Sequence, residues 1–143
     1  MTQPLTKSNV DSKKSMYQLP LQSCKVQAGF PSFADDSIEE NIDLNKHLIK
    51  HPAATFFLRV TGDSMIKAGI HDNDLLIVDR SLTPNSGRVV IAAVEGYLTV
   101  KRLIIKDGKA YLHAENDAFL PITLTSDTGT HIWGVVTNVI HAL

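Results

Sequence analysis

The sequence has little that is typical of a secreted or membrane-spanning protein. Its single cysteine, Cys24, allows no disulfide within the chain, which fits a reducing compartment. Its longest aliphatic runs, Leu75–Val78 and Val89–Val94, fall well short of the ~20 apolar residues of a transmembrane helix. The first ten residues have no signal-peptide pattern. We therefore expect a cytoplasmic protein that does not associate with a membrane.

Common cofactor and metal motifs are also missing. The chain has no glycine-rich phosphate loop, no paired-cysteine motif and no His-Glu-x-x-His motif. His47 and His51 are spaced like metal ligands on one helix face, but no third ligand lies nearby. The other histidines are widely separated in the sequence: His71, His113, His131 and His141. The sequence therefore predicts no cofactor and no metal.

The composition is that of one globular domain with an uneven distribution of charge. The chain has 143 residues, 43% hydrophobic and 20% charged, with a net charge of −1, so it is not a basic nucleic-acid binder as a whole. Residues 1–28 contain four lysines against one acidic residue, Asp11, and their apolar residues follow no period. We predict an extended, mobile N-terminal arm over residues 1–28, followed by a folded domain over residues 29–143.

Local patterns predict a mostly β domain. Asp43 is a candidate N-cap for a helix from Leu44 to about Lys50, and residues 37–42 fit one or two helical turns. The dipeptides Glu95-Gly96 and Asp107-Gly108 predict tight hairpins. Apolar and β-branched runs predict strands over residues 55–61, 75–78, 88–94, 97–106, 110–114 and 131–140. Because strands and helices do not alternate, a doubly wound α/β fold is disfavoured.

Ser64 is a candidate nucleophile. It follows a predicted strand and Gly62, at a corner where its hydroxyl projects and nearby backbone N–H groups are left free to form an oxyanion hole. The segment from Gly62 to Ile66 lacks the second glycine of a nucleophile elbow. The alternative is that Ser64 only caps the turn.

Lys101 is a candidate general base for that serine. Strand alternation places it on one face with Thr99 and Leu103, and this face is otherwise apolar. Burial disfavours the charged amine and lowers its pKa from ~10.4, and a neutral lysine can accept a serine proton. Arg102 is expected on the opposite, solvent-facing side. The alternative is that Lys101 extends along the strand to water.

Several separated segments, in this order and spacing, resemble the LexA-type serine–lysine self-cleaving family, peptidase family S24. The resemblance runs from about residue 26 to the end of the chain. The segments are Ala28–Ser32, Ile42–Asn45, His51–Thr55, Gly62–Met65, Gly69–Asp79, Thr99–Arg102 and Trp133–Val136. Asn73 stands where many relatives have glycine, and asparagine also tolerates positive φ.

The resemblance implies a fold and a reaction. The fold would be a LexA-like β-clip peptidase domain, mostly β, with one or two short helices and an extended N-terminal arm. Ser64 would be the nucleophile and Lys101 the base, and the backbone amides of Asp63 and Ser64 would hold the oxyanion. The chain would cut its own arm between Ala28 and Gly29, whose small side chains let the backbone approach closely.

The resemblance also implies partners. The protein would form a homodimer, and a RecA filament on single-stranded DNA would stimulate its cleavage in the SOS response. The shortened chain would join a Y-family polymerase subunit in mutagenic translesion synthesis. Because only 28 residues precede the predicted cleavage site, we expect no helix-turn-helix domain and no direct sequence-specific DNA binding.

Three other hypotheses remain at this point. The chain could be a non-catalytic adaptor for a polymerase or for RecA, which would stay intact at pH ~10, near the ordinary lysine pKa. It could be a repressor fragment lacking its DNA-binding domain, which operator binding by the intact chain would support. It could be a signal-peptidase-like enzyme, which would cleave exported proteins in trans.

Overall fold

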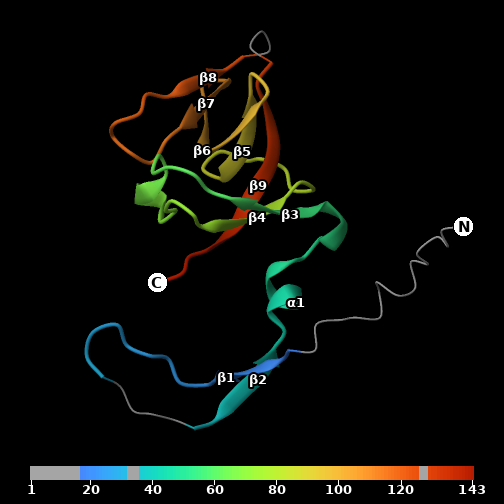
Figure 1. Ribbon diagram of the computed structural model, residues 1–143, viewed down its shortest axis with the longest axis vertical. Coiled ribbons are helices and arrows are strands. Elements are labelled where there is room, and N and C mark those ends of the chain that lie inside the picture. The colour runs from blue at the N-terminus through green and yellow to red at the C-terminus, as the bar shows by residue number, and fades with distance from the viewer. Residues whose placement is uncertain (1–16, 32–35, 126–128) are drawn as a thin grey trace, which may run out of the picture. The chain divides into compact units, whose positions relative to one another are not determined.

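The computed structural model describes residues 17–31, 36–125 and 129–143 (Figure 1). The chain divides into two compact units, residues 1–50 and 51–143, which are described here one at a time. Most of the predicted arm, residues 1–16, and Ser32 of the predicted turn lie outside the described residues. The predicted boundary between the arm and the domain, at residues 28 and 29, was based on the expected cleavage site and not on compactness, so it stays a prediction.

The first unit contains a two-stranded antiparallel sheet and one short helix. Strands β1 (Leu19–Gln22) and β2 (Ile38–Ile42) pair, and helix α1 (Leu44–Leu48) follows. The predicted helix start is confirmed, because the Asp43 carboxylate accepts a hydrogen bond from the Asn45 N–H at 3.0 Å.

Two local predictions for the first unit are wrong. Residues 37–42 were predicted as helical turns, but Ile38–Ile42 forms β2, and the arm contributes the unexpected strand β1. Both segments are extended because β1 and β2 pair with each other, with Leu19 opposite Ile42. A local sequence pattern does not reveal such a pairing.

The second unit is built on one seven-stranded antiparallel sheet. The strand order is β3-β4-β9-β5-β6-β7-β8. The strands are β3 (Thr55–Arg59), β4 (Leu75–Asp79), β5 (Val89–Val94), β6 (Tyr97–Lys106), β7 (Lys109–His113), β8 (Ile122–Leu124) and β9 (His131–Ile140). Two 3₁₀ turns, η2 (Pro52–Ala54) and η3 (Ile66–Ala68), flank β3. No helix within the described ranges is long and apolar enough to cross a membrane.

Strand β9 holds the sheet together. Its C-terminal half pairs with β4, from Val135 to Ile140, and its N-terminal half pairs with β5, from His131 to Val135. Figure 1 shows β9 running through the unit between these two groups of strands. The mostly β fold and all six predicted strands are confirmed, whereas the three-residue β8 is too short to show alternation.

The predicted turns are confirmed by their backbone angles. Glu95 and Gly96 have φ of 50° and 82°, and Asp107 and Gly108 have φ of 52° and 73°. Two successive positive φ values are the mark of a type I′ hairpin, which matches the right-handed strand twist. Asn73 has φ of 71°, so it adopts the conformation that glycine would supply.

The buried side chains of the second unit form two clusters. The first cluster comprises Val60, Met65, Ile70, Leu76, Val78, Ile91 and Val136. The second comprises Val90, Ala92, Leu103, Leu112 and Val135. Met65 is only 1% exposed, so the residue after Ser64 is anchored in the core. This anchor fixes the loop that carries Ser64.

Gly134 in β9 has no side chain, and this lets the Val78 side chain of β4 pack directly against its backbone. A Cβ at this position would lie 2.6 Å from Cγ1 of Val78, which is fully buried. We expect Gly134→Ala to lower the free energy of unfolding by about 1–3 kcal/mol, measured by urea denaturation. In a Val78→Ala background the clash is gone, so the same substitution should cost less; an equal cost in both backgrounds would contradict the packing argument.

Candidate active site

Ser64 lies in the loop between β3 and η3, and the ends of this loop are held firmly. Gly62 has φ of 95°, and its N–H donates to Asp72 Oδ1 at 2.7 Å. The carbonyl of Asp63 accepts hydrogen bonds from the Ile66 N–H at 3.2 Å and from Asn116 Nδ2 at 3.1 Å. Together with the buried Met65, these contacts fix the backbone on both sides of Ser64.

Lys101 lies in the middle of β6, opposite Val90 of β5, and is 9% exposed. Its Nζ is 3.1 Å from Ser64 Oγ and 3.0 Å from Thr99 Oγ1. The carbonyl oxygen of Val100 is 3.2 Å from the same nitrogen. The fold thus brings the two candidate residues into hydrogen-bond contact, and Thr99 shares the face of Lys101 as strand alternation predicts.

Burial of the Lys101 side chain controls its protonation. Desolvation lowers the pKa of the amine, because the charged form loses its hydration. Among the described residues no carboxylate forms an ion pair with Lys101, so nothing of opposite charge restores the ordinary value. The amine is therefore biased toward the neutral, proton-accepting form.

The three acceptors around Lys101 Nζ orient its lone pair. A neutral amine has two N–H groups and one lone pair. If the N–H groups donate to Thr99 Oγ1 and the Val100 carbonyl, the lone pair faces the Ser64 hydroxyl. After proton transfer, the ammonium has three donors for the same three oxygens. The site can therefore hold both protonation states with little rearrangement.

Two backbone amides next to Ser64 are free to bind an oxyanion. Within the described part of the chain, the N–H groups of Asp63 and Ser64 donate no hydrogen bond. Free N–H groups beside a nucleophile are the donors that an oxyanion hole requires.

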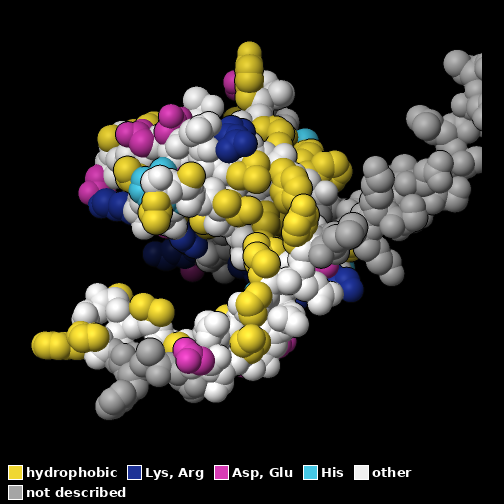
Figure 2. Space-filling model, turned by 60° about the horizontal axis from the view of Figure 1, so that its bottom comes forward, with side chains coloured by type: hydrophobic (Ala, Val, Ile, Leu, Met, Phe, Trp, Pro, Cys, Tyr) yellow, Lys and Arg dark blue, Asp and Glu magenta, His cyan; other side chains and the backbone are white. Residues whose placement is uncertain are grey.

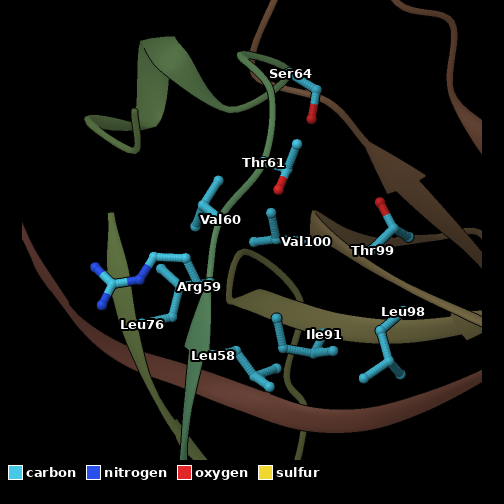
Figure 3. Close-up of a pocket in the computed structure, with 10 residues that line it drawn as sticks. All are labelled: Leu58, Arg59, Val60, Thr61, Ser64, Leu76, Ile91, Leu98, Thr99 and Val100. Carbon is cyan, nitrogen blue, oxygen red and sulfur yellow. The ribbon is translucent and has the colours of Figure 1, made fainter. Parts of the chain in front are cut away.

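A groove of about 350 Å³ opens at Ser64 (Figure 3). In this view the hydroxyls of Ser64, Thr61 and Thr99 lie toward one end, and aliphatic side chains lie toward the other. The lining residues are Leu58, Arg59, Val60, Thr61, Ser64, Leu76, Ile91, Leu98, Thr99 and Val100. Strand β3 is an edge strand of the seven-stranded sheet, so one side of it has no strand partner there. An edge strand beside an apolar groove can receive an extended peptide.

Arg102 differs from its prediction. It was expected to face solvent, but its side chain is only 29% exposed and forms an ion pair with Glu115. Its Nη1 also donates to the Gly87 carbonyl at 2.6 Å. The reason is that Glu115 and the Gly87 carbonyl lie against the guanidinium on this face of β6. The backbone carbonyl of Glu115 accepts the Lys67 N–H at 2.9 Å, which connects the residue that pairs with Arg102 to the turn that follows Ser64.

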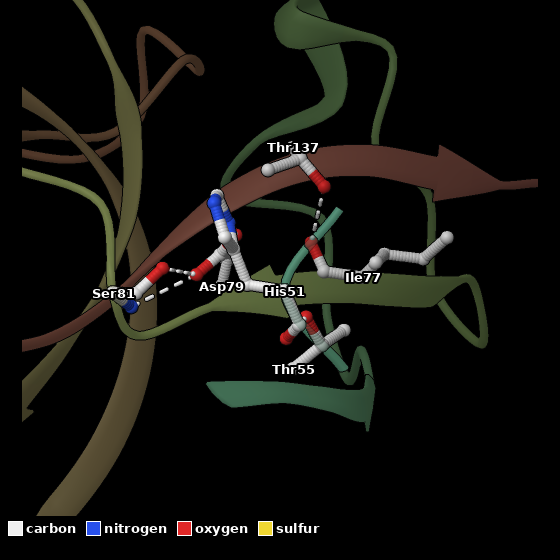
Figure 4. Close-up of polar contacts among 6 residues, drawn as sticks. All are labelled: His51, Thr55, Ile77, Asp79, Ser81 and Thr137. Atoms are coloured by element: carbon white, nitrogen blue, oxygen red, sulfur yellow. Dashed lines mark hydrogen bonds and ion pairs between the residues drawn. The ribbon is translucent and has the colours of Figure 1, made fainter. Parts of the chain in front are cut away.

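The His47–His51 pairing is also wrong. Helix α1 ends at Leu48, so His51 is not on the helix and the two rings do not share a helix face. His51 Nδ1 instead lies 2.5 Å from Asp79 Oδ2, and the Ser81 hydroxyl donates to Asp79 Oδ1 at 2.6 Å (Figure 4). Burial raises the pKa of Asp79, but the hydrogen bonds from Ser81 and His51 outweigh it and lower the pKa overall. These hydrogen bonds hold His51, the first residue of the second unit, against Asp79 at the end of β4.

The predicted cleavage residues lie in the first unit. Ala28 and Gly29 are exposed and form part of a bend at residues 28–30. The supporting role of Asn116 was not predicted, since it lies in a loop without a motif. Asp72 lies within a segment that resembles the family, but its contact with Gly62 was not predicted. Thr99 was noted only as a small polar residue beside Lys101.

The comparisons with known proteins agree with this geometry. Residues 20–137 match the Peptidase S24-like family, and the chain belongs to that family of serine peptidases. It is 47% identical over 125 residues to Protein ImpA of Salmonella typhimurium, covering 87% of this chain and 85% of that one. It is 37% identical over 123 residues to Protein MucA of Escherichia coli, covering 86% and 84%.

A LexA repressor from Colwellia psychrerythraea is 40% identical over 119 residues, which cover 82% of this chain but 56% of the repressor. Within the S24 family the chain is thus one of the UmuD-like proteins, the self-cleaving subunits of error-prone polymerases in SOS mutagenesis. The expected family and enzyme class are confirmed.

Burial of Lys101 predicts how stability depends on pH. Its folded-state pKa lies below the unfolded value of ~10.4, so between the two values the unfolded chain binds more protons. The free energy of unfolding should therefore rise with pH across that window, and Lys101→Met should lack this rise. Urea denaturation at a series of pH values measures both, and identical pH profiles for the two proteins would contradict the prediction.

Proposed function

We propose that the chain removes its own N-terminal arm by cutting the Ala28–Gly29 bond, with Ser64 as nucleophile and Lys101 as general base. The observation that carries the proposal is the 3.1 Å contact between Ser64 Oγ and a buried Lys101 Nζ that has no acidic partner among the described residues. A serine hydroxyl is a weak nucleophile, and an adjacent neutral base activates it.

The reaction follows from these contacts. Neutral Lys101 accepts the hydroxyl proton as Ser64 Oγ attacks the carbonyl carbon of Ala28. The N–H groups of Asp63 and Ser64 bind the resulting oxyanion. Lys101 then gives the proton to the departing amine of Gly29, which leaves Ala28 as an ester on Ser64. Lys101 then deprotonates a water molecule that attacks this ester. The bond to Ser64 Oγ breaks, Lys101 returns the proton to Oγ, and the arm leaves with a carboxylate at Ala28.

Two features support the arm as substrate. Alanine and glycine have small side chains, which let a peptide backbone approach a nucleophile in a narrow groove. The groove has an apolar lining and is bordered by the unpaired edge of β3, where a segment of the arm would add as an extended strand. Docking of the arm would also exclude water and favour neutral Lys101 further.

The product would be the chain over residues 29–143, and its partners follow from the family. We infer that it forms a homodimer and joins a UmuC-type Y-family polymerase subunit, and that a RecA filament on single-stranded DNA stimulates the cleavage. Hydrophobic side chains gather on one face of the second unit in Figure 2, and Phe56, Phe57 and Ile140 are among its exposed apolar residues. Such a surface suits protein partners. A polymerase subunit acts on the chromosome, so we place the protein in the cytoplasm.

Alkaline self-cleavage tests the nucleophile, the base and the cleaved bond together. After incubation at pH ~10, near the ordinary lysine pKa, we expect fragments that end at Ala28 and begin at Gly29 by intact mass. Ser64→Ala and Lys101→Ala should each slow cleavage by at least about a thousandfold. The controls are Ser86→Ala, in the loop before β5, and Lys106→Ala, at the end of the strand that carries Lys101. Both residues are exposed, and both variants should cleave normally.

The same experiment distinguishes self-cleavage from the hypothesis that the protein is a non-catalytic adaptor. If the unsubstituted chain stays intact at pH ~10, and again with RecA, single-stranded DNA and ATP, then the protein does not cleave itself and the non-catalytic adaptor hypothesis is supported. Cleavage of the Lys101→Ala protein at the normal rate would instead remove Lys101 from the mechanism. Cleavage at another bond would overturn the assignment of Ala28 and Gly29.

A further inference from the structure

Three side chains from two distant parts of the sequence converge at one end of the sheet in the second unit. His71 and Asp74 lie in the turn before β4, and His141 directly follows β9. The nitrogen and oxygen atoms that they offer lie within 4.8 Å of one another. His71 and His141 are widely separated in the sequence, and the pairing of β4 with β9 brings them together.

His71 has a ring nitrogen that lacks a partner. Its Nδ1 is shielded from solvent and forms no hydrogen bond. The Asp74 carboxylate oxygen Oδ2 is 3.7 Å away, which is too far for a hydrogen bond. A buried polar atom without a partner costs stability, and a bound ion is one explanation for it.

Asp74 is held in place as a ligand would be. It is 3% exposed, and the backbone N–H of His71 donates to its Oδ2 at 2.8 Å. Its other oxygen lies 2.6 Å from His141 Nδ1.

The two imidazole rings complete the arrangement. The centroids of His71 and His141 are 4.5 Å apart with an angle of 30° between the ring planes. The Nδ1 atom of each ring lies near the Asp74 carboxylate, 3.7 Å from Oδ2 for His71 and 2.6 Å from Oδ1 for His141. The ring side chains are 44% and 40% exposed, which leaves a path for an ion from solvent.

We propose that His71, Asp74 and His141 bind a divalent transition-metal ion of the zinc type, through both Nδ1 atoms and one carboxylate oxygen. Two imidazoles and a carboxylate are a known zinc ligand set, and a water molecule would fill the fourth tetrahedral position. The ion would take the place of the hydrogen bond between His141 Nδ1 and Asp74, and each neutral ring would carry its hydrogen on Nε2. This proposal is independent of the proposed self-cleavage.

The site would connect the C-terminal tail to the groove. The Asp74 carbonyl accepts the Val60 N–H at 2.9 Å, and the Asn73 N–H donates to the Val60 carbonyl at 2.8 Å. Val60 lines the groove next to Ser64. An ion held by His71, Asp74 and His141 would therefore fix the tail after β9 against the turn that supports one wall of the groove.

Zinc binding by the full chain tests the proposal. The metal-free Ser64→Ala protein, which should stay intact, is titrated with Zn²⁺ by calorimetry, and Co²⁺ is used as a spectroscopic probe of tetrahedral geometry. We expect one ion per chain, and a Tm that rises by roughly 5–15 °C at a hundredfold excess over Kd. His71→Ala and His141→Ala, added separately, should weaken binding at least about tenfold, while circular dichroism verifies that both fold.

His47→Ala and His113→Ala, added to the same protein, are matched controls. Each removes one histidine outside the cluster and should leave the affinity and the Co²⁺ spectrum unchanged. The proposal is overturned if the Ser64→Ala protein binds no Zn²⁺, or if binding survives both His71→Ala and His141→Ala. Equal loss of binding in the His47 or His113 variant would also overturn it, because the ion would then sit at scattered surface histidines.

Discussion

The contact between Ser64 and the buried amine of Lys101 is the interaction on which the rest of this structure depends. A lysine that is 9% exposed and lacks a carboxylate partner among the described residues is an unfavourable residue to bury in a small domain. The same burial lowers its pKa and makes it a base. Burial of Lys101 therefore lowers the stability of the fold and at the same time makes the amine able to accept the Ser64 proton.

The surrounding structure offsets that cost and keeps the geometry fixed. Oxygens of Ser64, Thr99 and Val100 surround Lys101 Nζ, so the amine is satisfied in its neutral and charged forms. The loop that carries Ser64 is anchored by the buried Met65 below it and by Asn116, which contacts the neighbouring carbonyl. Neither residue of the pair therefore depends on a mobile segment for its position.

The sequence revealed the local features of the fold and missed those that come from tertiary pairing. Strand alternation predicted the burial of Lys101, and a single side chain, Asp43, marked the start of the helix. Strand β2 was missed because its partner β1 lies in a segment without any apolar period. Arg102 was misplaced because alternation gives the face of a strand but does not show what covers that face.

The candidate site was predictable in part for the same reason. Ser64 and Lys101 stood out because a serine at a strand corner and a lysine in an apolar strand are each unusual. Asn116 and the His71–His141 pair carry no local signal, since their positions depend on loops and on the joining of β4 and β9.

Chemical labelling of Ser64 measures directly whether Lys101 controls the reactivity of the serine, without the arm as substrate. The full chain would be treated with a small fluorophosphonate across a range of pH, and the rate of modification at Ser64 followed by peptide mass. We predict a rate that rises with pH to a plateau, with a midpoint below ~10.4 that is absent in Lys101→Met. A rate with the same pH dependence in both proteins would contradict the account.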